Sequence, residues 1–300
     1  DTTDRVFVIP AYLDITLHTN AQKIDFKDAE LTNVLGEVII RDQSINLSNL
    51  KMDSNIGRGN MTMFYTAKDY SGASAGFDLD MEDVMVEKLI GLYPAIDTLV
   101  PMLRSFEGVV DCQVTATCKM DSTMSLELPS LHSACYLHGE NMVLLDGETF
   151  TEISKTLMFK NKKRNVIDSI SVDLAIKDNK IEVFPFLVEM DRYKVAVGGT
   201  HNLDMTFNYH LSVLKSPVPF KLGIDITGNL DDFKYKIVKC RYKDLFKPAK
   251  EAELDSTRTN VRKEIRESIR NQIKETAPEL VSSLSPNHTV TPPEGETNAL

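Results

Sequence analysis

Apolar and polar residues alternate along most of the first 246 residues, which is the pattern of β-strands with one covered face. Leu13, Ile15 and Leu17 alternate with polar residues near the start of the chain. The same period of two runs through "GFDLDMED" from Gly76 and through "VVDCQVTATCK" from Val109. Short polar turns such as "RDQS" and "KDNK" separate the runs. We therefore expect antiparallel meanders rather than strands joined by crossover helices.

One unit of turn and strand is present twice. The stretch "IRDQSINLSNLKM" begins at residue 40, and "IKDNKIEVFPFLVEM" begins at residue 176, so that Asp42 matches Asp178 and Ile45 matches Ile181. Both copies continue as turn, strand, turn and strand. A duplication of this kind predicts an elongated sheet that is extended by similar meanders.

The second copy is apolar on both faces between residues 183 and 188, so its strand needs cover on both sides. Pro185 lacks an N–H donor, which predicts an edge position or a β-bulge. Strict alternation places Phe184 and Phe186 on the same face. Two interpretations stay open: a core closed by helices, or a groove for acyl chains. The residues expected to line such a groove are Phe184, Phe186, Val188, Met190, Val195 and Val197.

Three segments have helical periodicity instead. Residues 82–106 and 147–159 repeat apolar positions at helical spacing, and we expect short helices that cover parts of the sheet. Beyond Pro248, a charged segment carries an apolar residue at every fourth position from Val261 to Ile273, which predicts a helix with a narrow apolar stripe. In the scaffold alternative described below, this stripe would be an exposed surface for a partner.

The predicted fold is mainly β: an elongated, bent antiparallel sheet built from internal β-meander repeats, with short helices covering parts of it and a C-terminal charged helix. Residues 1–106 form the first repeat region with its helical plug, and residues 107–249 form the second. The charged helix follows at 250–275. Residues 276–300 are polar and rich in proline, which predicts a disordered tail.

The net charge of −10 argues against nucleic acid as a partner, because its phosphates would be repelled. No apolar run is long enough to span a bilayer. The chain does not begin with Met or with a signal peptide, and we interpret it as cut from a longer precursor. Cys112 and Cys118 lie roughly 20 Å apart on one predicted strand, too far for a disulfide. Either could meet Cys135 across a hairpin, but buried free thiols are favoured.

No catalytic, cofactor or metal site is predicted. "GASAG" at residues 72–76 matches the GxSxG motif, but an alternating strand follows it where a helix is required, so we interpret a glycine-rich hairpin turn. Asp78 and Asp80 are expected on the wet face of that strand rather than in a calcium site. A basic cluster of Lys160, Lys162, Lys163 and Arg164 is either a solvated loop or a contact for anionic head groups.

Four stretches follow one another in the second half of the chain. They are the strand ending in Pro185-Phe186, then "VAVGGTHNLDM", a strand around Tyr209, and the closing "ITGNLDDFKYKI". Residues 140–237, which contain them, resemble the C-terminal region of the AsmA-like family of bacterial envelope proteins. Residues 13–80 are similar to the repeat unit of that family. The resemblance implies a periplasmic body with a hydrophobic trough. It also implies a tether to the inner membrane, although this chain has no such anchor.

The resemblance implies a role in moving phospholipid to the outer membrane and in outer-membrane biogenesis. Our hypothesis is a non-enzymatic protein that shields and conducts phospholipid acyl chains along an apolar β-groove. The alternative is a scaffold that binds outer-membrane proteins or assembly factors at an open sheet edge and so regulates protein targeting to the membrane.

Overall fold

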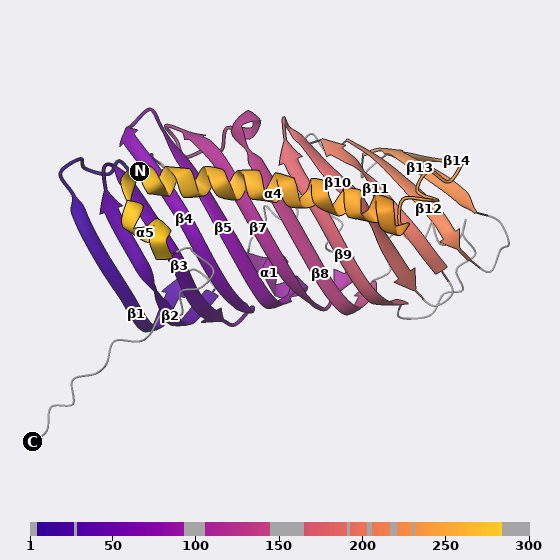
Figure 1. Cartoon of the computed structure of the whole chain (residues 1–300), viewed down its shortest axis with the longest axis horizontal. Coiled ribbons are helices and arrows are strands. Elements are labelled where there is room, and N and C mark those ends of the chain that lie inside the picture. The colour runs from indigo at the N-terminus through magenta and orange to yellow at the C-terminus, as the bar shows by residue number, and fades with distance from the viewer. Residues whose placement is uncertain are drawn as a thin grey trace, which may run out of the picture.

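A single antiparallel sheet dominates the protein. The structure, a computed structural model, describes residues 5–26, 29–92, 106–144, 165–190, 193–202, 206–216, 221–229 and 232–283. These residues form a 14-stranded sheet that does not close on itself (Figure 1). The mainly β fold, the antiparallel meanders and the C-terminal helix expected from the alternation pattern are therefore confirmed.

The strands lie across the sheet in the order of the sequence, with one exception. The exception is β6, which pairs with β8 and lies off the main path. The strands are β1 (Asp14–Phe26), β2 (Ala29–Arg41), β3 (Ser44–Ser54), β4 (Arg58–Asp69), β5 (Gly72–Met85), β6 (Phe106–Glu107), β7 (Val109–Asp121), β8 (His132–Leu144), β9 (Asn165–Lys177), β10 (Lys180–Met190), β11 (Tyr193–Asn202), β12 (Phe207–Lys215), β13 (Leu222–Gly228) and β14 (Phe233–Val238).

The duplicated unit has the same turn in both copies. Asp42 and Gln43 have φ values of 51° and 60°, and the matching Asp178 and Asn179 have 53° and 60°. Two consecutive residues with positive φ are typical of a type I′ turn, whose twist suits a two-residue hairpin. The structural equivalence predicted from the repeat is confirmed at this turn.

Four helices complete the described part of the chain. They are α1 (Val86–Leu92), the short 3-10 helix η2 (Leu128–Ser130), α4 (Pro248–Thr276) and α5 (Pro278–Ser283). The α4 helix runs along the length of the sheet, across one face of its strands, and ends near α5 and the first strands (Figure 1). The α1 helix packs on the opposite face, where Val86 and Leu89 are buried.

The predicted boundary between residues 106 and 107 lies within one continuous sheet, because β5 pairs directly with β7. The predicted tail is wrong over α5, whose Leu280 is fully buried against α4 and the sheet. The expected helix at residues 147–159 and the basic cluster at residues 160–164 lie outside the described residues. So do residues 93–105 of the first expected helical segment.

The apolar stripe of α4 is buried, which corrects the interpretation of an exposed partner surface. Ile265, Ile269 and Ile273 pack against Ile39 of β2 and Phe64 of β4. A narrow stripe suffices here because the helix lies on a sheet face that is largely polar, and only a few apolar side chains project from it. The helix and sheet meet through a thin hydrophobic seam flanked by ion pairs.

Candidate functional site: the apolar face of the sheet

The face of the sheet opposite α4 is apolar across nearly its whole length. Residues that are partners in register lie side by side on one face, so the strand pairings define lateral rows of side chains. One row of twelve residues crosses eleven strands, from β3 to β14 without β6, and contains no polar residue. This central row consists of Leu50, Met61, Leu79, Val114, Cys135, Leu174, Val183, Phe186, Val197, Leu211, Ile224 and Ile237.

A second row lengthens the apolar face toward the first strand. It links Ile15, Ile40 and Ile45 to Tyr65, Ala75 and Cys118 through successive pairings. Most of the central row is half-buried rather than sealed, including Leu79, Val114 and Leu211. Phe77 on the same face is 37% exposed. Water therefore contacts an extended hydrocarbon surface on this side of the sheet.

A β-bulge in β10 decides where the two phenylalanines point. Val183 pairs with Gly199 and Phe186 with Val197, so Phe184 and Pro185 together oppose Gly198. In a β-bulge, two residues of one strand lie opposite one residue of the neighbouring strand. Pro185 accounts for the position of this bulge, because proline has no N–H to donate to the neighbouring strand. Gly198 permits the close approach, since a Cβ there would lie 2.9 Å from Pro185 Cα.

The bulge overturns the prediction that Phe184 and Phe186 share a face. Phe184, which is 7% exposed, lines a cavity beside Val261 and Ile265 of α4. Phe186, which is 9% exposed, belongs to the cluster that α1 covers through Val86 and Leu89. Of the two, only Phe186 lies on the apolar face. Its burial beneath α1 matches the closed-core interpretation at this one position.

The other predicted groove residues divide as follows. Val188 and Val197 are half-buried and pack against the same cluster as Phe186. Val195 is buried in a neighbouring cluster with Val213 and Ile224. The side chain of Met190 lies outside the described residues. The sequence thus located part of the apolar face correctly, but it missed the longer row that begins at Leu50.

The α4 face has the opposite character. Arg266 Nε donates to Asp78 Oδ1 at 2.8 Å, and its Nη2 lies 3.3 Å from Asp80 Oδ1. Arg262 Nη2 donates to Asp173 Oδ1 at 2.8 Å, and its guanidinium lies 5.3 Å from the Tyr136 ring centroid. The interpretation of Asp78 and Asp80 as a solvated face is therefore wrong, because α4 covers that face.

Burial shapes the ionisation of these groups. Desolvation raises the pKa values of Asp78 and Asp173, and the neighbouring arginines oppose this shift only in part. On the apolar side, burial raises the pKa of the Cys112 thiol to about 11 and also raises that of Cys135. All four cysteines are free, so neither Cys112 nor Cys118 forms the disulfide to Cys135 that the sequence left open. Cys112 and Cys135 are therefore components of the apolar face, and burial disfavours their thiolate forms.

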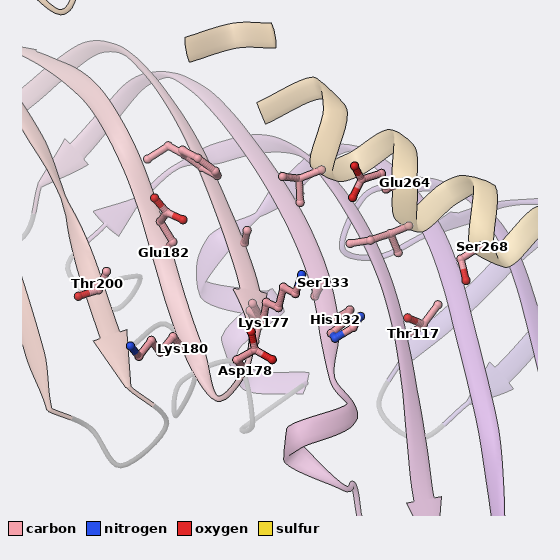
Figure 2. A pocket seen from close by; sticks show the side chains of 15 residues that line it. Thr117, His132, Ser133, Lys177, Asp178, Lys180, Glu182, Thr200, Glu264 and Ser268 are labelled. Carbon is pink, nitrogen blue, oxygen red and sulfur yellow. The ribbon is translucent and has the colours of Figure 1, made fainter. Parts of the chain in front are cut away.

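A cavity of about 560 Å³ lies between α4 and strands β7 to β11 (Figure 2). Glu264 and Ser268 approach it from the helix, whereas Lys177, Asp178 and Lys180 lie at the β9–β10 turn. Charges of both signs surround it, and no single ligand chemistry is favoured. The "GASAG" stretch at residues 72–76 forms the start of β5, with the turn at the two preceding residues.

Within the ranges that the structure describes, no three His, Cys, Asp or Glu side chains gather as they would around a metal ion. None of the described helices combines the length and hydropathy that crossing a membrane requires. Comparisons of the chain with family models, curated proteins and solved structures found no match. The resemblance to the AsmA-like family stays a prediction.

Proposed function

We propose that this protein holds phospholipid acyl chains on the apolar face of its sheet and lets them move along it, without catalysing a reaction. The observation that carries the proposal is the central row, an uninterrupted series of apolar side chains across eleven strands. Leaving such a surface in water costs about 25 cal/mol per Å² of apolar area, and a bound hydrocarbon chain removes that cost.

The geometry of the sheet also supports movement. Neighbouring strands lie about 4.8 Å apart, so a chain that shifts sideways by one strand meets a similar set of aliphatic groups. Near-equivalent positions keep the barrier between them low, because each contact that is lost is replaced by another of the same kind. Bound head groups would remain in water beyond the sheet. The resemblance of residues 140–237 extends the proposal to a periplasmic protein of the bacterial envelope, tethered to the inner membrane in its full-length form.

The test is organic extraction of the purified protein followed by mass spectrometry of the lipids. We expect co-purified phospholipid in the wild type and a loss of at least tenfold in Leu79→Asp and Phe77→Asp, because a charged carboxylate in the row opposes contact with hydrocarbon. The matched control is Ser74→Asp, which places the same charge on the same strand but on the α4 face.

Two outcomes contradict the proposal. One is wild-type protein without lipid after purification and after incubation with vesicles. The other is an equal loss of lipid in Ser74→Asp, which would mean that the charge acts without regard to the face. Leu79→Met keeps an apolar side chain and retains lipid if the surface acts by partition. Urea unfolding of each variant separates loss of lipid from loss of the fold.

A second candidate function rests on the open ends of the sheet. Among the strands that the structure describes, β1 pairs with β2 alone, so one side of its backbone is open to another strand. A scaffold that adds a strand of an outer-membrane protein or assembly factor there would use main-chain hydrogen bonds for affinity. Lipid-free protein that binds an extended polypeptide, with binding abolished by proline at Thr16, supports this candidate instead.

A further inference from the structure

One end of the molecule is strongly basic although the chain is acidic. Residues 233–250 hold seven Lys or Arg side chains and one Asp, within a chain of net charge −10. They form β14 and the segment that leads into α4, which lie together at one end of the sheet (Figure 1). All seven cations are exposed: Lys234, Lys236, Lys239, Arg241, Lys243, Lys247 and Lys250.

The same end exposes two apolar side chains on the last strand. Tyr235 is 50% exposed and Ile237 is 62% exposed. They pair with Ile226 and Ile224, so they extend the apolar face to its final edge. Lys234 and Lys236 alternate with them and therefore point to the other side of the strand. The edge is thus apolar on one side and cationic on the other.

Lysine on an edge strand also has a structural explanation, since it discourages pairing with another sheet. That explanation accounts for Lys234 and Lys236 only. The five cations beyond them lie outside the strand, and the segment after β14 is held against the α4 face by its own bonds. Arg241 N–H donates to His210 Nε2 at 3.2 Å, and Tyr242 N–H donates to Ser212 Oγ at 3.0 Å.

Within the described residues, only two of these seven cations form ion pairs. Arg241 pairs with Asp225, and Lys247 Nζ lies 2.6 Å from Asp244 Oδ1. The opposite edge of the sheet differs, because residues 14–41 hold three Lys or Arg and five Asp or Glu. The segment 233–250 is therefore net basic, whereas the strands at the opposite edge are net acidic.

We propose that the β14 end, defined as residues 233–250, docks on an anionic lipid bilayer, with Tyr235 and Ile237 inserted between head groups. Charge complementarity selects this partner: each cation near an anionic membrane surface contributes about 1 kcal/mol, and exposed Tyr and Ile suit the interfacial layer. The role of this docking rests on the proposed function, since docking would bring the end of the apolar face into contact with the acyl region of the bilayer.

The experiment is sedimentation of the full chain with vesicles made of phosphatidylcholine alone or of equal parts phosphatidylcholine and phosphatidylglycerol. We expect binding to the anionic vesicles that weakens in 1 M salt, where the Debye length falls to about 3 Å. Replacing Lys234, Lys236 and Lys239 by Gln is expected to weaken binding on the order of a hundredfold, at about fivefold per cation.

The matched control replaces Lys51, Lys68 and Lys119 by Gln, which removes the same charge from exposed positions elsewhere. We expect this variant to bind as the wild type does. A second pair of changes, Tyr235→Ser and Ile237→Ser, is expected to remove the part of binding that persists in high salt.

The inference is overturned if the chain ignores anionic vesicles, binds phosphatidylcholine equally well, or loses as much affinity in the control triple variant. Capture of an extended polypeptide by β14 in place of vesicles also overturns it. Lipid extraction separates this inference from the proposed function. Protein that carries lipid but does not dock contradicts the docking alone, whereas protein that docks but carries no lipid contradicts the carriage alone.

Discussion

Asp173 shows how single side chains fix α4 on the sheet. Its carboxylate accepts a hydrogen bond from Arg262 and lies 3.6 Å from Arg258, and all three side chains are largely buried. Arg258 also donates to the carbonyl of Pro185, at the bulge of β10. A desolvated carboxylate is costly by itself, which explains its raised pKa, so the two arginines mainly offset a penalty.

Removing the Asp173 carboxylate is expected to destabilise the folded protein. Asp173→Ala leaves two guanidinium groups at the interface without their partner, and we expect a loss of about 3 kcal/mol in the free energy of unfolding. The measurement is urea denaturation followed by circular dichroism. Asp255→Ala is the control, because Asp255 is 60% exposed and lies 3.1 Å from the same Arg258. We expect it to cost less than about 0.5 kcal/mol. Equal costs would contradict this account.

At the scale of elements, the hairpin turns are the best test of the repeat. The turn at Asp178 and Asn179 requires left-handed backbone, which a β-branched residue adopts poorly. Asn179→Val is expected to cost about 1–2 kcal/mol, whereas Asn179→Gly is expected to be neutral or stabilising. Unfolding midpoints in urea measure both. Val at Lys180, in the strand just beyond the turn, is the control, and a similar cost there would count against the turn geometry.

Much of the fold could be predicted from the sequence, because the patterns that specify strands and turns lie within short stretches of the chain. Alternation gave the strands, and the matching of Asp42 with Asp178 located two equivalent turns. The bulge at Pro185 was expected as one of two possibilities, but its effect on Phe184 was not, because one extra residue reverses the face of all residues that follow.

The position of α4 could not be predicted in the same way. Its arginines at 258, 262 and 266 recur every four residues and match acidic side chains on β5 and β9. That spacing was visible in the sequence, but a charged helix with a narrow apolar stripe is equally compatible with solvent. The central row was hidden for a related reason. It joins residues from eleven strands, and their lateral order depends on pairings that no local pattern specifies.

On the scale of the whole molecule, α4 and α5 supply contacts between distant parts of the chain. Strands on the main path mostly pair with neighbours in sequence, as in repeat proteins. The helices instead connect residues as far apart as Arg41 and Glu279, whose Nη1 and Oε1 atoms lie 2.6 Å apart. We infer that the helices make the unfolding of the sheet cooperative.

A chain that ends at Lys247 tests this role. Without α4 and α5, we expect the single unfolding transition to broaden, with a calorimetric enthalpy larger than the van't Hoff enthalpy, because segments of the sheet then unfold separately. Differential scanning calorimetry measures both quantities. Ile269→Asp in the full chain weakens the contact between α4 and the sheet without removing the helix, and we expect it to broaden the transition to a smaller extent. A sharp two-state transition in both would contradict the inference.

The sequential order of the strands has a further consequence for biosynthesis. Each hairpin can form as soon as it leaves the ribosome or the translocation channel, since its partner has already emerged. The α4 helix, which covers the polar face, is made after all of these strands. Until then, the apolar face of the growing sheet contacts water without the support of the helix, and we expect chaperones that bind apolar surface to assist its folding.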